Sequence, residues 1–187
     1  VAFTISGTAI DLFTLYAPEV IESFQKLAST GCVEFLGETY AHSLVSLKNR
    51  EEFRIQAEAH SGKMAELFGQ RPKVFNNTGL IYSDYIGEIV AESGFKAILT
   101  EGARHILRRS SPNYLYCNPF NSDLKILLNN TALSENLALR LSNPGWKGWT
   151  AAEDNYISML NVIPEEEGIV NLYFDYDTIC RGQKKAG

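Results

Sequence analysis

A short apolar run that ends in a carboxylate decides the fold of this chain: Phe95-Lys96-Ala97-Ile98-Leu99-Thr100-Glu101-Gly102. The run has the pattern of a buried β-strand, and Glu101 stands where the strand would pass into a loop. A second run repeats the design near the C-terminus and ends in Asp175: Ile169-Val170-Asn171-Leu172-Tyr173-Phe174-Asp175. In α/β folds the carboxyl ends of parallel strands carry the side chains that bind and react. The two acids are therefore candidates for acid–base and nucleophilic chemistry, although a single acid at such a place is more often solvated or caps a helix.

Strand-like runs and helical segments alternate along most of the chain. The strand candidates lie at 1–6, 32–36, 73–76, 95–102, 113–117, 124–129 and 169–175. The helical candidates lie at 18–29, 49–68, 83–92, 134–140 and 151–160, with a short helix or turn at 102–107. Pro18 at a first helical position, Asn49 as an N-cap and Gly69 as a C-cap support these boundaries. Alternating βα units predict an α/β fold with a parallel sheet and right-handed crossovers, and seven strands suit a barrel better than a flat sheet.

Composition narrows the class of protein and its partners. With 187 residues and 45% hydrophobic residues, the chain is long enough for one domain with a real core. A net charge of −5 gives no attraction to nucleic acid or to an anionic membrane. No apolar run approaches the length of a membrane span, and no signal peptide is visible. The three cysteines are widely spaced, which indicates neither a zinc site nor a disulfide framework. We therefore expect buried, reduced thiols in a cytoplasmic protein.

Several stretches together resemble glycoside hydrolase family 57, the α-amylase and 4-α-glucanotransferase family. The matching stretches are VEFLGETYAHSL at 33–44, NTGLIY at 77–82, AILTEGAR at 97–104, RLSN at 140–143 and NLYFDYDT at 171–178. The resemblance covers nearly the whole chain, and the order and spacing of the pieces are more specific than any one of them. The α-amylase-like branch of the family is the most similar.

The resemblance implies a (β/α)7-type parallel barrel, an α-glucan or maltooligosaccharide substrate, a retaining mechanism, and neither a metal nor an organic cofactor. Glu101 falls on the position of the family's catalytic nucleophile, and Asp175 on that of its general acid/base. Retaining hydrolysis requires two carboxyl groups about 5–5.5 Å apart, so we expect both acids in a common pocket. On this basis 1–178 form a partial catalytic barrel domain and 179–187 a polar tail.

The sequence departs from the family pattern at both ends. The family's first motif, a His-x-Pro stretch on the first strand, is absent. After 175–178 the family usually continues Phe-Gly-Glu-His, whereas this chain continues Ile179-Cys180-Arg181-Gly182-Gln183. We therefore expect an incomplete barrel that lacks the first strand and the C-terminal region.

Three further residues are candidates for contact with a sugar or for support of the site. The resemblance places His42 in the stretch that shapes the sugar site next to the cleaved bond, whereas a histidine on its own is more often a surface or core residue. Glu38 either holds this loop or contacts the sugar. Arg104 is one helical turn past Glu101 and either pairs with a carboxylate or is solvated.

The remaining candidates lie toward the C-terminus. Trp146 and Trp149 straddle two glycines in a loop, where an exposed indole can stack on a sugar face, but anchoring in the core is equally compatible with their spacing. Asp177 follows Asp175 by two residues and would share its strand face, as a supporting residue.

Three alternatives stay open at the level of the sequence. Hydrolysis and glycosyl transfer share a covalent intermediate, so a 4-α-glucanotransferase would use the same two acids. A truncated homologue could bind α-glucan without turning it over. A metal-dependent polysaccharide deacetylase uses a similar barrel, but it would need an Asp and two His ligands at close spacing. The only histidines are His42, His60 and His105, and no HxxxH pair occurs. The sequence does not indicate an oligomeric state.

Overall fold

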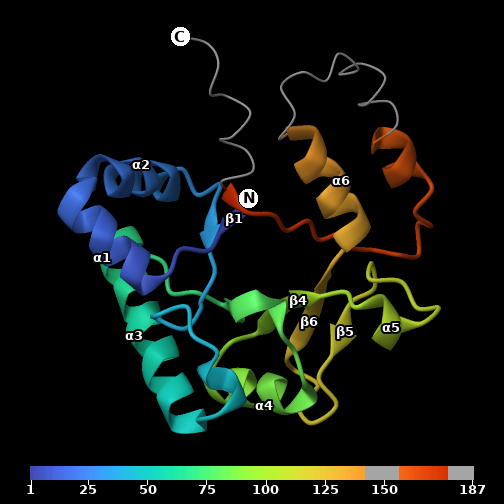
Figure 1. Ribbon diagram of the computed structural model, residues 1–187, viewed down its shortest axis with the longest axis horizontal. Helices are drawn as coiled ribbons and strands as arrows, with labels where there is room; N and C mark the ends of the chain where they lie inside the picture. The colour runs from blue at the N-terminus through green and yellow to red at the C-terminus, as the bar shows by residue number, and fades with distance from the viewer. Residues whose placement is uncertain (142–155, 177–187) are drawn as a thin grey trace. The chain divides into compact units, whose positions relative to one another are not determined.

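A computed structural model of the protein describes residues 1–141 and 156–176 (Figure 1). Contacts divide the chain into two compact units, which are described separately. The first unit comprises Val1–Thr100 and Tyr116–Leu127, and the second comprises Glu101–Leu115 and Leu128–Gly187. Among the described residues, no helix is both long and apolar enough to cross a membrane.

The described strands form two sheets. They are β1 (Ala2–Phe3), β2 (Glu34–Phe35), β3 (Val74–Asn76), β4 (Ala97–Glu101), β5 (Tyr116–Cys117) and β6 (Lys125–Asn129). β1 pairs with β2 in parallel, and the second sheet has the order β3-β4-β6-β5. A parallel bridge between Gly37 and Phe75 continues the pairing from the end of β2 to β3.

β3, β4 and β6 lie side by side in their order along the chain and run in the same direction. β3 and β4 are parallel. β4 and β6 also run together, because the Lys125 N–H donates to the Lys96 carbonyl at their beginning and the Asn129 carbonyl lies against Gly102 at their end. This sequential parallel order is the order that βα units produce.

Two strand predictions need correction. The strand within 113–117 breaks the parallel pattern: β5 pairs antiparallel with β6, because the connection at 118–124 is too short for a parallel crossover. The run 169–175 is not a regular strand, since it forms only one parallel bridge, from Asn171 to Asn129. Side-chain hydrogen bonds hold the rest of this run, as described below.

Local capping signals set most helix boundaries. The helices are α1 (Gly7–Tyr16), α2 (Pro18–Ser29), α3 (Arg50–Phe68), α4 (Asp84–Glu92), α5 (Arg104–Leu107) and α6 (Thr131–Leu141), with a further helical turn at 156–161. The Asn49 side chain accepts from the Glu52 N–H, and Gly69 ends α3 in the left-handed conformation at φ 67°. The Ser83 side chain likewise caps α4. The boundaries of α2, α3 and α4 confirm the predicted ones to within a residue, whereas α6 begins three residues before the predicted start at 134. Residues 151–155 of the predicted helix at 151–160 lie outside the described residues.

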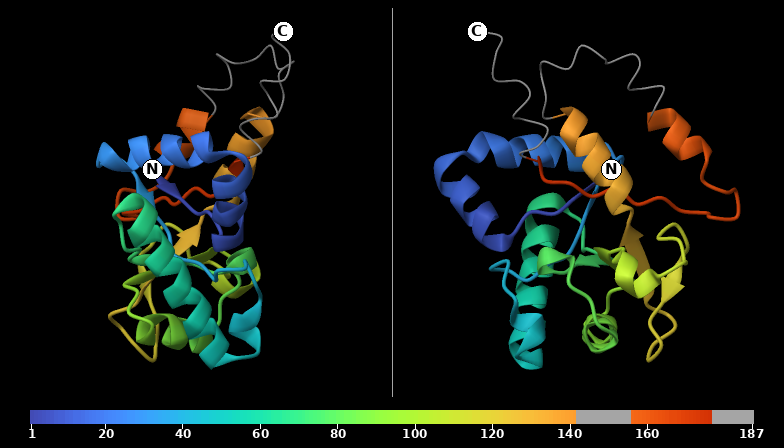
Figure 2. Two further views of the ribbon diagram at one scale, coloured as in Figure 1. Left: turned by 90° about the vertical axis from the view of Figure 1, so that its left-hand side faces the viewer. Right: turned by 45° about the vertical axis from the view of Figure 1, so that its right-hand side comes forward.

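α1 lies between the predicted strand at 1–6 and the predicted helix at 18–29, and the sequence did not predict it. Ser6 caps the helix by accepting from the Ala9 N–H. A Cβ atom at Gly7 would lie 2.5 Å from the Tyr40 ring, so only glycine allows the helix to begin against this ring. α2 follows α1 after a sharp turn and packs beside α3, as the two views of Figure 2 show.

Aromatic rings fill the core of the first unit. The Phe35 and Phe68 rings stack with centroids 4.4 Å apart at 12°, beside Ile10 and Met64. Phe75 packs against the ring of Phe95 with a centroid distance of 4.9 Å. The contact between Phe35 and Phe68 packs α3 against β2, and the contact between Phe75 and Phe95 packs β3 against the residues that precede β4.

The thiols of the described cysteines are not buried, contrary to expectation. Cys32 is exposed because it lies in the turn after Gly31, which has a φ of 69° and ends α2. Cys117 is exposed on β5, at the edge of its sheet. Cys180 lies outside the described residues.

Polar side chains hold the second unit together. The Glu167 carboxylate accepts hydrogen bonds from the Ser111 hydroxyl at 2.5 Å and the Asn113 amide at 2.8 Å. The Asn113 amide oxygen accepts from the Asn130 side chain, and its backbone carbonyl accepts from the Ile169 N–H. This network fastens the beginning of the run 169–175 to the segment that follows α5.

Candidate active site

Glu101 is the last residue of β4, and its side chain is exposed. The apolar residues of β4 before it are buried, so the strand anchors the backbone and leaves the carboxylate at its open end. Gly102 follows in a buried position, where an added Cβ would lie 2.6 Å from the Asn129 carbonyl oxygen and 3.0 Å from Pro112. The end of β4 is therefore in direct contact with the end of β6.

Asp175 lies beyond the same end of the neighbouring strand. The backbone of Asn171 pairs in parallel with Asn129, the last residue of β6, so the chain runs past the end of β6 toward Asp175. The Tyr173 N–H donates to the Asn129 side-chain oxygen at 3.1 Å. Asp175 is exposed, like Glu101. Glu101 and Asp175 are thus both exposed, on two segments that each lie next to β6, and neither is enclosed in an aliphatic core.

In the first unit, polar side chains gather at the carboxyl ends of three strands, and two of them, Glu38 and Asn76, are buried. Thr4 follows β1, Glu38 follows β2, and Asn76 ends β3. The Thr4 hydroxyl donates to a Glu38 carboxylate oxygen at 3.1 Å and accepts from the Asn76 amide at 3.4 Å. Glu38 is 2% exposed, so its carboxylate depends on these partners in place of water. Thr4 and Asn76 were not among the predicted site residues.

His42 is bound directly to Glu38. Its Nδ1 lies 2.6 Å from the second Glu38 carboxylate oxygen, and since a carboxylate accepts, Nδ1 carries the proton of this bond. The backbone of His42 has a φ of 51°, which is uncommon for a residue with a side chain. The imidazole is 54% exposed, and its Nε2 remains for another partner. These hydrogen bonds link Glu38 to the loop, and its contact with a sugar stays a prediction.

His60 supports the same loop from α3. Its Nδ1 accepts from the Glu38 backbone N–H at 3.4 Å, and its Nε2 therefore donates to the Ile5 carbonyl at 2.9 Å. The side chain is fully buried. Burial lowers the pKa of His60 below its usual value of 6.5, although the Ile5 carbonyl and the charge of Glu38 act in the other direction. The neutral imidazole thus links the segments after β1 and β2.

The other predicted site residues are described only in part. Arg104 begins α5, and its pairing with a carboxylate stays a prediction because its side chain is not described. Trp146, Trp149 and Asp177 lie outside the described residues. Within 1–141 and 156–176, no group of three or more His, Cys, Asp or Glu side chains lies close enough to hold a metal ion.

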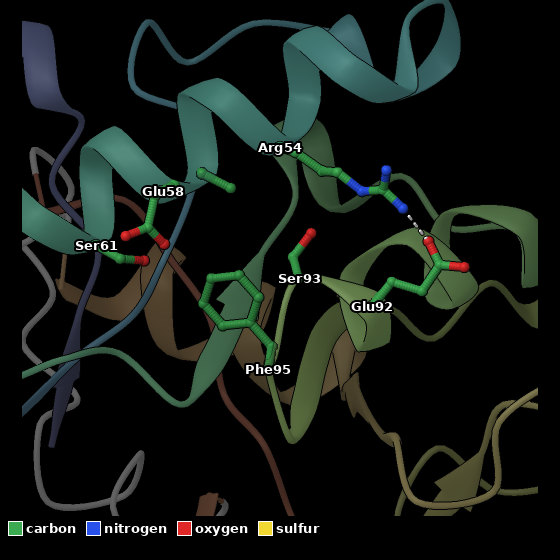
Figure 3. A pocket seen from close by; sticks show the side chains of 7 residues that line it. Arg54, Glu58, Ser61, Glu92, Ser93 and Phe95 are labelled. Atoms are coloured by element: carbon green, nitrogen blue, oxygen red, sulfur yellow. Dashed lines mark hydrogen bonds and ion pairs between the residues drawn. The ribbon is translucent and has the colours of Figure 1, made fainter.

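A cavity of about 240 Å³ lies between α3 and the segment after α4 (Figure 3). Its lining includes Arg54, Glu58, Glu92 and Phe95. Arg54 is paired with Glu92, and Glu58 is paired with Arg71, so these charges already have partners within the protein. None of the predicted site residues lines this cavity, and we do not assign it to the candidate active site.

Comparison with solved structures shows the fold class of this chain. The crystal structure of 4-alpha-glucanotransferase from Thermococcus litoralis matches with a TM-score of 0.73 at 12% identity, over 92% of this chain and 26% of that chain. The crystal structure of a "putative polysaccharide deacetylase" from Mycobacterium smegmatis matches with a TM-score of 0.61 at 16% identity, over 91% and 56%. At these identities the likeness concerns the fold alone. With the parallel strand order, it confirms the predicted α/β fold of the (β/α)7-barrel type.

Sequence comparisons identify the family. The family model of Glycosyl hydrolase family 57 matches residues 1–187, so the chain belongs to this family. A protein of Methanocaldococcus jannaschii described as "Putative alpha-amylase" is 40% identical over 179 residues. The match covers 95% of this chain and 38% of that relative, so the chain spans well under half the length of its relative.

Proposed function

We propose that this chain carries the two catalytic acids of a retaining glycoside hydrolase that acts on α-1,4-glucans. Glu101 is the nucleophile and Asp175 is the general acid/base. The observation that carries the proposal is the placement of both acids at the same end of the sheet, on two segments that both contact Asn129 at the end of β6. Family membership and the 40% identical relative support an α-glucan as the substrate.

The proposed reaction has two steps. In the first, a Glu101 carboxylate oxygen attacks the anomeric carbon while Asp175 gives its proton to the leaving glycosidic oxygen. The bond to the leaving sugar breaks, and a glycosyl ester forms on Glu101. In the second step Asp175 takes a proton from water, the water oxygen attacks the anomeric carbon, and Glu101 leaves as a carboxylate. No step requires a metal or an organic cofactor.

The Glu38–His42 pair has a separate proposed role in substrate binding. Glu38 fixes the Nδ1 side of the imidazole, which leaves the exposed Nε2 for a sugar hydroxyl. A carboxylate that orients a histidine in this way also fixes which ring nitrogen carries the proton.

The test is release of reducing sugar from maltooligosaccharide by the wild-type protein and single variants. We expect Glu101→Gln to abolish release, and Asp175→Asn to reduce it by about 10²–10⁴-fold, the usual contribution of a general acid/base. Glu166→Gln is the matched control, because Glu166 is an exposed acid of the same unit. Equal background rates in the wild type and Glu101→Gln would instead support a homologue that binds glucan without turnover.

A further inference from the structure

We infer that Asn129, at the end of β6, is the positioning residue that fixes Asp175 relative to Glu101. The inference rests on the proposed function, since it assigns the support of the two proposed catalytic acids to one side chain. Asn129 is only 5% exposed, and both its backbone and its side chain contact the segments that carry these acids. It acts through these segments and has no chemical step of its own.

The backbone of Asn129 fixes the end of β4. Gly102 directly follows Glu101, and a Cβ atom at Gly102 would lie 2.6 Å from the Asn129 carbonyl oxygen. The two backbones therefore touch at the point where β4 ends. Because a packed interior transmits small displacements, a shift of the Asn129 peptide would move Gly102 and the Glu101 backbone beside it.

The side chain of Asn129 fixes the segment that carries Asp175. Its Oδ1 accepts hydrogen bonds from the Tyr173 backbone N–H at 3.1 Å and from the Ser134 hydroxyl at 2.7 Å. Ser134 Oγ also accepts from the Tyr173 N–H, at 3.0 Å. Tyr173 precedes Asp175 by two residues, so these bonds set the direction in which the chain leaves the single bridge at Asn171.

An asparagine suits this place for a chemical reason. Its amide oxygen has two lone pairs and accepts both bonds without adding a negative charge near two carboxylates. The reaction requires a carboxyl separation of about 5–5.5 Å, and a misplacement of about 1 Å can reduce a rate by about 100-fold. Loss of the acceptor would release the Asp175 segment while Glu101 stays on β4.

The test compares two substrates that differ in their need for a proton donor. Maltotriose has a poor leaving group that must be protonated, whereas in α-maltosyl fluoride the fluoride leaves with little help from an acid. We expect Asn129→Ala to reduce kcat/KM on maltotriose by about 100-fold and to affect kcat/KM on α-maltosyl fluoride far less, because this ratio reports the first step alone and the second step is common to both substrates. Asn129→Asp, which keeps the acceptor oxygen, should recover part of the lost rate on maltotriose.

Two controls separate positioning from general destabilisation. Asn118 is also fully buried and holds loops through its side chain, but it belongs to the first unit. Asn118→Ala should lower both rates equally. Ser134→Ala keeps Oδ1 of Asn129 as an acceptor and should give a smaller change in the same direction, which provides a second variant should Asn129→Ala not fold. Equal losses on the two substrates in Asn129→Ala would overturn the inference.

A further readout does not depend on turnover. Hydrogen exchange of the Tyr173 amide should be faster in Asn129→Ala than in the wild type, because one of its two acceptors is removed and Ser134, which holds the other, loses its own partner. An unchanged exchange rate at Tyr173 would also overturn the inference. The proposed function fails on a different result, namely full activity of Glu101→Gln or Asp175→Asn, so the two failures are distinguishable.

Discussion

At the scale of the residue, His60 makes the stability of the fold sensitive to acid. Burial lowers its pKa in the folded protein below the usual value of 6.5, so between these two values the unfolded chain binds more protons than the folded one. The contribution of His60 is fully present above about pH 6.5 and is lost as the pH falls toward the folded pKa. We expect the free energy of unfolding in urea to fall between pH 7 and pH 5, by about 1.4 kcal/mol for each unit of pKa difference.

His60→Gln separates this effect from other acid-sensitive groups. A glutamine amide can donate and accept as the imidazole does, but it does not titrate. We expect the variant to be less stable at pH 7 and to lose less stability on acidification than the wild type. The same slope of unfolding free energy against pH in both proteins would contradict the assignment to His60.

At the scale of the element, two glycines have opposite expected effects when replaced by alanine. Gly62 lies exposed within α3 with no atom close to an added Cβ, so Gly62→Ala should stabilise the protein by about 0.5–1 kcal/mol. Gly102 lies where the ends of β4 and β6 touch, and Gly102→Ala should destabilise it by about 1–3 kcal/mol because backbone atoms cannot rotate away. Urea unfolding of the two variants measures both values, and a change of the same sign in both would contradict the described contacts.

Elements with local signals were predictable from the sequence, and elements set by distant contacts were not. Pro18 and the caps at Asn49 and Ser83 act within their own helices, and the predicted boundaries of α2, α3 and α4 are confirmed to within a residue. α1 has a local cap at Ser6, but its first residue packs against the ring of Tyr40, which lies far along the chain. The run 169–175 has a strand-like pattern, but it forms a single bridge, and the Tyr173 N–H donates to side chains instead of to a neighbouring strand.

In the candidate site, too, the residues with a local sequence signal were predictable and the residues set by distant contacts were not. The positions of Glu101 and Asp175 followed from apolar runs that end in an acid, and the structure places both beyond the ends of parallel segments. Their catalytic roles stay predictions. No local pattern pointed to Asn129 or Thr4, because the role of such an amide or hydroxyl is identified only by the partners that folding brings to it.

At the scale of the whole molecule, the bonds of His42 and His60 favour the proposed glycosidase over a metal-dependent deacetylase of similar fold. Such a deacetylase needs two histidines and an aspartate around one ion. Both nitrogens of His60 are bonded to backbone groups, and His42 is bonded to Glu38 through Nδ1. His60 could bind a metal only if the segments after β1 and β2 separated. We therefore expect dialysis against EDTA to leave release of reducing sugar from maltooligosaccharide unchanged. Loss of this activity on dialysis and its recovery with Zn²⁺ would contradict the two-carboxylate mechanism.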